Sequence, residues 1–312
     1  MYYDLAPMEG ITTYIYRSTF EKYYGGIDRY YTPFLASMHL SSREKNEVLP
    51  EHNEGMTLIP QILSNRADEF LKITKTLQDF GYDTVNLNLG CPSGTVVSKH
   101  RGSGFLAVPD ELDTFLAEIF DKCPLNISIK TRLGISDESE WDTILKIYEK
   151  YPIRELIIHT RLQKDFYKLP TRPHTFAAAR KLGIPLCYNG DITSPEAQQA
   201  ALTADPHIDR FMLGRGIIGD PELIESLSGG TPARDKDRLQ SFLTDICDRY
   251  LAEMSGGERN TLYKLKEIWV YLGALFTDAD KYVKKIKKAN RLAEYESAML
   301  ALFDNCEMKA NT

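Results

Sequence analysis

The segment of residues 86–93, with the sequence NLNLGCPS, combines residue types that could carry out chemistry. It completes a short apolar run and ends in a turn that carries the thiol of Cys91 between a glycine and a proline. Side chains alternate along a strand, so Asn86 and Asn88 are expected on one face. A thiol beside two amides at a strand end suits a reactive site. The alternative is a buried structural cysteine, as most free cysteines are.

Two glycine-containing turns later in the chain are typical of a phosphate site. They are Asn189-Gly190-Asp191 and Gly214-Arg215-Gly216. Glycine lets backbone amides approach an anion, and an arginine adds positive charge. Each turn alone is a weak signal and could be an ordinary loop, but both follow the last strand candidates of the chain. In a (β/α)₈ barrel the loops after strands seven and eight are the usual phosphate site.

Lys130 and His159 end two further strand candidates, and Gln61 ends another. In a barrel mouth with a phosphate anchor, the lysine and histidine could hydrogen-bond the pyrimidine side of a flavin, and a fixed cation there stabilises the reduced flavin. Gln61 could offer both amide atoms to the same ring edge. Arg132 shares a face with Lys130, and Arg161 shares one with His159. Both arginines are expected nearer solvent, free for a substrate.

Eight β-rich runs must position these residues, and helical patterns separate them. This alternation predicts a (β/α)₈ TIM barrel, an α/β fold, with a doubly wound open sheet as the competing topology. The strand candidates are residues 2–8, 31–36, 57–63, 84–89, 127–132, 155–159, 185–189 and 210–213. The helical patterns between them include residues 68–80, 110–120, 141–150 and 195–203.

A turn-rich break at residues 228–232 separates this region from an all-helical tail, with helices predicted at 237–254, 259–276 and 278–303. We therefore predict a catalytic barrel at 1–232 and a helical C-terminal domain at 233–312. Residues 258–291 of the tail hold nine basic and four acidic residues, a local balance of +5 on a chain of net charge −6. This asymmetry favours a nucleic-acid contact. Lys99 and Arg101, shortly after Cys91, could add a second phosphate contact.

Composition limits the function classes. The chain has 312 residues, 43% hydrophobic and 26% charged, as in an ordinary globular protein. No apolar run approaches the roughly 20 residues needed to cross a bilayer, and the N-terminus lacks a signal-peptide pattern. The five cysteines are scattered, without metal-ligand spacing. We expect free thiols in a reducing cytoplasm, no metal site and no membrane association. A monomer would suffice.

Taken together, these residues resemble the tRNA-dihydrouridine synthases over nearly the whole chain. The segment from Asn88 to Pro92 is the most specific match, whereas other flavin barrels share the phosphate turns. The matching segments, in the family's order and spacing, are residues 6–10, 60–61, 88–92, 130–132, 159–161, 189–191 and 214–216.

The resemblance implies an FMN-dependent, NADPH-driven reduction of the C5–C6 double bond of particular uridines in tRNA. It assigns Cys91 as the general acid that protonates C5 and Asn88 as a contact to the target base. A thiol, with an ordinary pKa of roughly 8.5, is mostly protonated at neutral pH and can donate. From their positions and charge, and not from the resemblance, we predict further substrate contacts at Arg132, Arg161, Lys99, Arg101, Lys284, Lys285 and Lys288. The residues that would hold FMN are Pro7, Met8, Gln61, Lys130, His159, Asn189, Gly190, Asp191, Gly214 and Arg215.

The loop of residues 162–176 departs from the family pattern. It lacks the usual glycine before Tyr167, and His174-Thr175-Phe176 stands where an acid–tryptophan pair often follows. This loop is expected near the substrate. We therefore expect its departure from the family pattern to affect which uridine is selected.

Two rival functions fit part of the pattern. An FMN barrel that acts on a small molecule, such as a dihydroorotate dehydrogenase or an ene-reductase, explains the phosphate turns and Lys130 but needs no basic tail. A non-catalytic RNA-binding flavoprotein explains the tail but has no use for Cys91. The position of the reduced uridine does not follow from the sequence, and the preference for NADPH follows from the resemblance alone.

Overall fold

The computed structural model describes residues 1–230 and 233–310 and divides into two compact units. Unit 1 comprises Met1–Pro7, Asp28–Gly190 and Gln199–Met212. Unit 2 comprises Met8–Ile27, Asp191–Gln198 and the described part of Leu213–Thr312. The domain boundary predicted between residues 232 and 233 involves Pro232, which lies outside the described residues, so this boundary stays a prediction.

The strands form a parallel barrel in the order β3-β2-β1-β9-β8-β7-β6-β5-β4. The two ends of this order, β3 and β4, are consecutive in the chain and separated by Pro60 alone, so the sheet returns to its starting point. Leu35, just after β2, forms a parallel bridge to Ile62 in β4 and adds to the closure. The predicted (β/α)₈ barrel is thereby confirmed. The strands are β1 (Tyr2–Leu5), β2 (Arg29–Tyr31), β3 (Leu58–Ile59), β4 (Gln61–Ile62), β5 (Thr84–Leu89), β6 (Asn126–Arg132), β7 (Leu156–His159), β8 (Leu186–Asn189) and β9 (Arg210–Leu213).

The third predicted strand, residues 57–63, differs from the prediction because it is split at Pro60 into β3 and β4. Proline has no N–H to donate to a strand ladder. Its carbonyl still accepts from the N–H of Asn86 at 2.9 Å, so the chain continues beside β5 after the interruption. As a result Gln61 begins β4 directly opposite Asn86.

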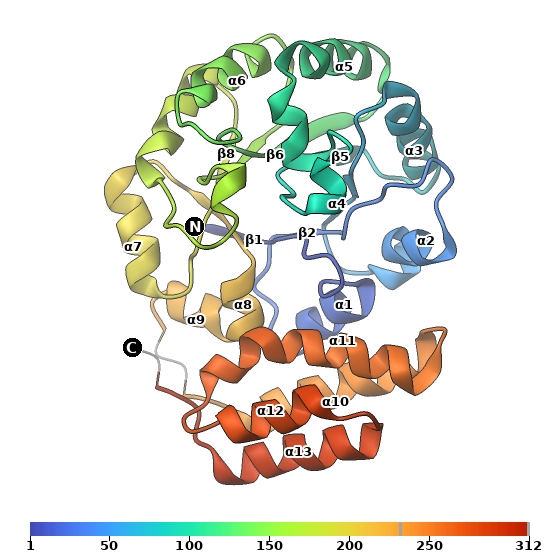
Figure 1. Cartoon of the computed structure of the whole chain (residues 1–312), viewed down its shortest axis with the longest axis vertical. Helices are drawn as coiled ribbons and strands as arrows, with labels where there is room; N and C mark the ends of the chain where they lie inside the picture. The colour runs from blue at the N-terminus through green and yellow to red at the C-terminus, as the bar shows by residue number, and fades with distance from the viewer. Residues whose placement is uncertain (231–232, 311–312) are drawn as a thin grey trace. The chain divides into compact units, whose positions relative to one another are not determined.

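The helices of unit 1 lie outside the strands, as Figure 1 shows for α3, α5 and α6. Each presents an apolar stripe to the barrel: in α3, for example, Phe70, Ile73 and Leu77 are buried. The four helices predicted between the strands agree with the observed ones to within about two residues at each end. The helices between the strands of unit 1 are α2 (Ser42–Val48), α3 (Ala67–Asp79), α4 (Gly94–Val97), α5 (Pro109–Lys122) and α6 (Glu140–Tyr148). Helix α7 (Pro195–Ala204) is shared by the two units.

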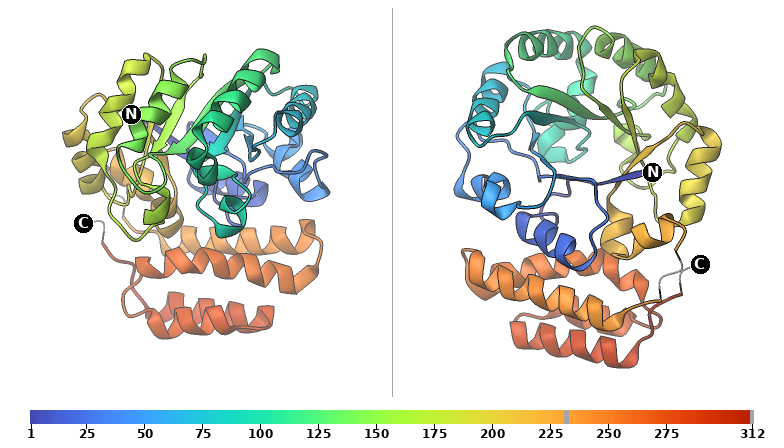
Figure 2. Two further views of the ribbon diagram at one scale, coloured as in Figure 1. Left: turned by 45° about the horizontal axis from the view of Figure 1, so that its top comes forward. Right: turned by 180° about the vertical axis from the view of Figure 1, so that it is seen from behind.

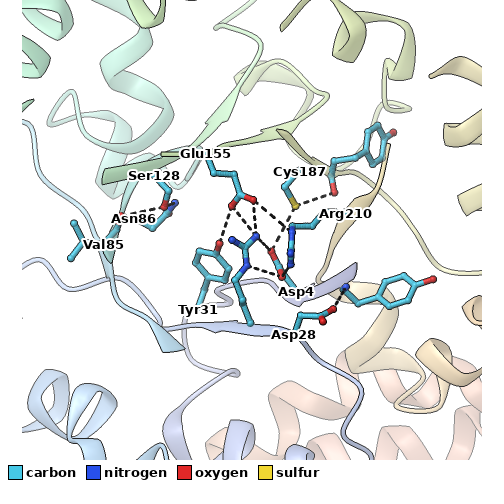
Figure 3. Close-up of polar contacts among 12 residues, drawn as sticks. Asp4, Asp28, Tyr31, Val85, Asn86, Ser128, Glu155, Cys187 and Arg210 are labelled. Atoms are coloured by element: carbon cyan, nitrogen blue, oxygen red, sulfur yellow. Dashed lines mark hydrogen bonds and ion pairs between the residues drawn. The ribbon is translucent and has the colours of Figure 1, made fainter. Parts of the chain in front are cut away.

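The amino-terminal end of the barrel holds a buried ionic cluster (Figure 3). Arg29 binds the carboxylates of both Asp4 (2.6 Å) and Glu155 (2.8 Å). Arg210 binds Asp4 at 2.7 Å, so two cations balance two carboxylates. The thiol of Cys187 donates to Asp4 at 3.9 Å and is fully buried, and burial raises its pKa. Loss of one charge would leave its partner uncompensated, so we assign this cluster to stability.

Unit 2 is helical, and α10 to α13 lie side by side in both views of Figure 2, as the orange and red ribbons. The predicted helical tail is therefore confirmed, with two differences. The helix predicted at 259–276 is shorter, because α11 ends at Leu272 and a 3₁₀ turn (Gly273–Leu275) follows it. Residues 278–303, predicted as one helix, form α12 and α13 with a break between them. The helices of this unit are α1 (Tyr14–Tyr23), α8 (Arg215–Gly219), α9 (Leu223–Leu227), α10 (Lys236–Glu253), α11 (Gly257–Leu272), α12 (Asp280–Lys288) and α13 (Leu292–Asn305).

Contacts from α11 explain the break between α12 and α13. The ammonium of Lys266 donates to the carbonyl of Ala289, and Glu258 accepts the N–H of Leu292. Both partners satisfy backbone groups that a continuous helix would use internally. These side chains are distant in sequence, which is why local periodicity did not predict the interruption. Among the helices of residues 1–230 and 233–310, none is both long and apolar enough to cross a membrane.

Candidate functional site

The turn that carries Cys91 follows β5 at the carboxyl end of the barrel, and its thiol residue is half-buried. Asn88 Oδ1 accepts the backbone N–H groups of both Gly90 and Cys91, each at 3.0 Å. From the other side, the hydroxyl of Ser103 donates to the Cys91 carbonyl at 2.8 Å. Gly102, at φ 56°, passes so close that an added Cβ would lie 2.8 Å from the same carbonyl. The backbone of Cys91 is therefore fixed on both sides.

A chain of side-chain amides runs from this turn into the barrel. Asn88 Nδ2 donates to Gln61 Oε1 at 2.7 Å, and Gln61 Nε2 donates to Asn86 Oδ1 at 2.7 Å. Asn86 Nδ2 then donates to the hydroxyl of Ser128 at 2.9 Å, which donates to the Val85 carbonyl at 3.1 Å (Figure 3). Asn86 lies opposite Gln61 on one side and Ser128 on the other, so strand register brings these groups together.

The two ends of this amide chain determine the orientation of every member. Val85 contributes a carbonyl, which can only accept, and Gly90 and Cys91 contribute N–H groups, which can only donate. The placement of the oxygen and the nitrogen of each intervening amide is therefore determined. Gln61 is fully buried, with both its amide atoms engaged. This differs from the prediction that it offers both atoms to a flavin: one N–H of Nε2 remains.

Lys130 extends from β6 beside Asn88 and donates to Asn189 Oδ1 at 2.7 Å. Asn189 is itself oriented by donating to the Met212 carbonyl at 2.8 Å. Among the described residues, Asn189 is the one hydrogen-bond partner of this ammonium, so two N–H donors remain for a ligand. Burial, together with the nearby guanidinium of Arg132, lowers the pKa of Lys130 to about 8. The side chain keeps partial exposure.

Arg132 and Arg161 are buried, which differs from the solvent-facing positions predicted for them. Arg132 donates to the carbonyl of Gly90 at 2.9 Å and to those of Leu162 (2.8 Å) and Phe166 (3.0 Å). Arg161 donates to the Leu169 carbonyl at 2.7 Å. The carboxyl ends of parallel strands leave backbone carbonyls that need donors, and these guanidinium groups supply them. Both arginines therefore position backbone, with Arg132 joining the Cys91 turn to the loop after β7.

His159 ends β7 in register with Arg132 and Asn189 and is nearly buried. Its Nε2 lies 3.2 Å from an Arg161 nitrogen. A guanidinium can only donate, so Nε2 accepts and the ring proton lies on Nδ1. The ring of Tyr167 lies 5.9 Å from the imidazole and 5.3 Å from the Arg132 guanidinium. Tyr167 was not among the predicted site residues; its exposed aromatic side chain in the divergent loop was the available signal.

The loop of residues 162–169 is rigidly anchored. Asp165 accepts the N–H of Leu162 at 2.8 Å and forms an ion pair with Arg172. Phe166 adopts φ 48° and ψ −106°, a conformation that side-chain-bearing residues rarely adopt and that costs on the order of 1–3 kcal/mol. Its side chain is 46% exposed, and Tyr167 and Leu169 are each 50% exposed. An exposed apolar group thus lies on a strained, fixed backbone.

The predicted phosphate residues are divided between the units. Gly190, in unit 1, has Thr171 only 2.8 Å from the position of an added Cβ, so packing within the protein already requires glycine there. In unit 2, Arg215 forms an ion pair with Asp191, and both are partly exposed. Gly216 passes close to the Ile192 carbonyl and has no room for a side chain.

The other predicted residues include Pro7, Met8, Lys99 and Arg101. Pro7 follows β1 in unit 1 and is half-buried, and Met8 begins unit 2. The exposed Lys99 is available for a ligand. Arg101 donates to Glu69 at 2.6 Å and to Asn65 at 3.1 Å, so its charge is balanced by a carboxylate. Among the described residues no cluster of three metal-ligating side chains occurs.

A basic groove of about 890 Å³ lies between α12 and α13. Lys284, Lys285 and Lys288 are exposed and, among the described residues, have no ion-pair partner. Lys287 is exposed on the same helix but does not line the groove. The break between the two helices creates this groove, so its shape did not follow from the sequence. Its basic lining residues are Lys281, Lys284, Lys285, Lys288 and Arg291.

Sequence comparison connects this arrangement to known proteins. The sequence model of the dihydrouridine synthase family, Dus, matches residues 4–309. A "tRNA-dihydrouridine synthase B" from Pasteurella multocida is 28% identical over 247 residues, covering 78% of this chain and 74% of the relative. A "Probable tRNA-dihydrouridine synthase 2" from Bacillus subtilis is 27% identical over 266 residues, covering 81% and 80%.

A comparison of structures supports the barrel. An old yellow enzyme homologue from Zymomonas mobilis superposes with a TM-score of 0.51 at 12% identity, over 77% of this chain and 91% of that chain. At this identity the likeness shows the fold alone. The family match covers nearly the whole chain and includes both the Cys91 turn and the helical tail. The chain therefore belongs to the dihydrouridine synthase family.

Proposed function

We propose that this protein is a tRNA-dihydrouridine synthase that reduces the C5–C6 double bond of a uridine in tRNA. The observation that carries the proposal is the Cys91 turn: a half-buried thiol whose backbone is fixed by Asn88 and Ser103, in a chain of the dihydrouridine synthase family. The two curated relatives named above support tRNA as the substrate. A small-molecule reductase would have no use for the unpaired lysines of the basic groove.

The side chains at the carboxyl end of the barrel fit a flavin. Lys130 offers a partly desolvated ammonium with donors to spare, held in place by Asn189. His159 and the remaining N–H of Gln61 would add contacts to the polar edge of the ring, and Pro7 and Met8 would line its apolar face. For the ribityl phosphate we propose Asn189, Gly190, Asp191, Gly214 and Arg215; the exposed Arg215–Asp191 pair keeps a guanidinium oriented for such a ligand.

When bound, FMN reduced by NADPH would supply a hydride to C6 of the uracil. The protein must then deliver a proton to C5, and we assign this step to the thiol of Cys91. Asn88 keeps one N–H of Nδ2 for the target base, since its other donor and its oxygen are engaged. Arg132 and Arg161 hold the surrounding backbone, so we assign them a positioning role in place of the predicted direct contact with substrate.

The uridine must leave the folded tRNA to reach the barrel, and this requires a surface that binds RNA. We propose that residues 233–312 are a tRNA-binding domain and that the basic groove contacts the phosphate backbone. Two other basic residues of this segment have structural partners instead: Lys264 donates to the Gly10 carbonyl at 2.7 Å and Lys266 to that of Ala289. Lys99 remains a further candidate for a phosphate contact.

Single-turnover reoxidation tests the proposed function. The holoenzyme is reduced anaerobically with NADPH and mixed with cellular tRNA that lacks dihydrouridine but is otherwise normally modified. We expect fast flavin reoxidation and dihydrouridine in the RNA, and mapping the product would identify the uridine. Reoxidation at the rate seen without RNA would contradict the proposal and favour the small-molecule reductase.

The lysine at the proposed flavin edge predicts a pH dependence of FMN binding. The pKa of Lys130 is about 8 in the protein without flavin, so the amine is mostly charged below pH 8 and mostly neutral above it. If FMN binds the charged form, its affinity falls as pH rises above 8, by up to about tenfold per pH unit. Lys130→Met should bind FMN more weakly at pH 7 and lose this dependence.

The measurement is fluorescence titration of the flavin-stripped protein with FMN between pH 6 and pH 10. Lys130→Arg is the matched control, because a guanidinium stays charged over this range. Identical pH profiles for the wild type and Lys130→Met would show that Lys130 does not contact the flavin.

Charge reversal in the basic groove should weaken tRNA binding. Lys284→Glu combined with Lys288→Glu changes two lining residues, each of which would otherwise contribute to phosphate neutralisation. We expect at least a tenfold rise in the dissociation constant for tRNA and a shallower salt dependence, with the flavin spectrum unchanged. Lys287→Glu, on the same helix outside the groove, should have a much smaller effect. Equal effects of the two changes, measured by filter binding, would contradict a role specific to the groove.

A further inference from the structure

The conformation of Phe166 is difficult to explain by the fold alone. Its φ of 48° with ψ of −106° suits glycine, the residue that the family pattern has before the tyrosine. The contacts that hold this residue use its backbone: Arg132 donates to its carbonyl, and its N–H donates to the Gln163 carbonyl at 3.1 Å. Glycine would keep both hydrogen bonds without strain. The phenyl ring is therefore present although the local backbone conformation favours glycine.

The protein covers only part of the Phe166 side chain. It is 46% exposed and, among the described residues, makes no aromatic or cation–π contact. Tyr167 and Leu169 beside it are also half exposed, so three apolar side chains face solvent within four residues of one loop. A strained backbone that displays an apolar group to solvent points to an external partner.

The position of the loop favours RNA as that partner. The guanidinium of Arg132 binds the Phe166 carbonyl and also the Gly90 carbonyl, so the loop is held next to the turn that carries Cys91. Extruding a uridine from a folded RNA leaves its neighbours without a stacking partner. Aromatic side chains provide that surface, and stacking tolerates any base because every base has a flat face.

We propose that Phe166 stacks on a tRNA base next to the extruded uridine and thereby strengthens tRNA binding. This inference rests on the proposed function and adds to it a tRNA-binding residue outside the flavin site. The anchors from Arg132, Arg161 and Asp165 keep the loop rigid, so the ring is presented without further ordering on binding.

Three variants of the holoenzyme test the role of the ring: Phe166→Gly, Phe166→Trp and, as the matched control, Tyr2→Ala. Tyr2 is 49% exposed but begins β1, at the opposite end of the barrel. Phe166→Gly should raise the apparent dissociation constant for tRNA about 5- to 150-fold, the range for loss of one base–aromatic stack. The single-turnover rate at saturating tRNA and the rate of flavin reduction by NADPH should stay unchanged. Its Tm should equal or exceed that of the wild type, because strain is removed.

The outcomes separate this inference from the function on which it rests. Phe166→Trp should restore tRNA affinity, and Tyr2→Ala should leave it unchanged. If the wild type makes dihydrouridine but Phe166→Gly binds tRNA equally well, the inference is wrong and the function stands. A loss of affinity that tryptophan does not restore, with a lowered Tm, would show a structural role for the ring and also overturn the inference. If the wild type makes no dihydrouridine, the proposed function fails first.

Discussion

Replacing Cys91 with serine is expected to lower uridine reduction by about 10²- to 10⁴-fold, the range that one general acid contributes. A serine hydroxyl is a far weaker acid than a thiol, so it cannot deliver the proton to C5 at neutral pH. The backbone of residue 91 is held by Asn88 and Ser103 through its own N–H and C=O, and serine keeps both contacts. FMN content, tRNA affinity and flavin reduction by NADPH should therefore remain as in the wild type.

Cys123 provides the matched control for this experiment. It is also half-buried and followed by proline, but it ends α5 ahead of β6, at the opposite end of the barrel. Cys123→Ser should react at the wild-type rate. The measurement is the amount of dihydrouridine formed in a single turnover with saturating tRNA. Near-native turnover by Cys91→Ser would remove the thiol from the mechanism and leave another proton donor to be found.

Removing the side chain of Asn88 should have the second largest effect. Asn88→Ala leaves the N–H groups of Gly90 and Cys91 without their acceptor and Gln61 Oε1 without its donor. Each unsatisfied buried group costs about 1–3 kcal/mol, so the turn is expected to shift. A displacement of the reacting group by about 1 Å can lower a rate about 10²-fold. We therefore expect kcat to fall by roughly that factor.

The far end of the amide chain gives the control for Asn88. Ser128→Ala removes the acceptor of Asn86. Asn86 is separated from the Cys91 turn by Gln61 and Asn88, so this change should lower kcat less than tenfold. Alkylation of Cys91 by iodoacetamide distinguishes two roles of Asn88: positioning the thiol and contacting the target base. The alkylation rate depends on the surroundings of the thiol and is measured without any RNA. If Asn88→Ala changes the tRNA KM but neither kcat nor the alkylation rate, Asn88 contacts the base and does not position the thiol.

Asn86 and Ser128 illustrate a limit of prediction from the sequence. The strand pattern placed Asn86 on the face of Asn88 but gave it no partner. Register between β4, β5 and β6 brings Gln61, Asn86 and Ser128 together, and register depends on pairings between segments far apart in the chain. The hydrogen bonds of Gln61 to Asn86 and Asn88 did not follow from the sequence for the same reason: no local pattern reveals these neighbours.

The arginines at the carboxyl ends of β6 and β7, Arg132 and Arg161, show the same limit in another form. An arginine at a strand end was expected to reach solvent, because long charged side chains usually do. In this barrel the backbone carbonyls of Gly90, Leu162, Phe166 and Leu169 need donors, and folded loops bring them within reach of Arg132 and Arg161. Those loops are irregular, so their path is set by tertiary contacts and not by periodicity.

The sequence by itself determined the barrel, the helical tail, the family and the candidate thiol. Eight apolar runs alternating with amphipathic helices have few other ways to bury their faces, and the Cys91 motif is short, local and specific. The tertiary structure decided the rest: the closure at Pro60, the amide chain, the buried arginines, the break that forms the basic groove and the strained Phe166. Each of these depends on contacts between residues distant in the chain, and such contacts leave no periodic signal in the sequence.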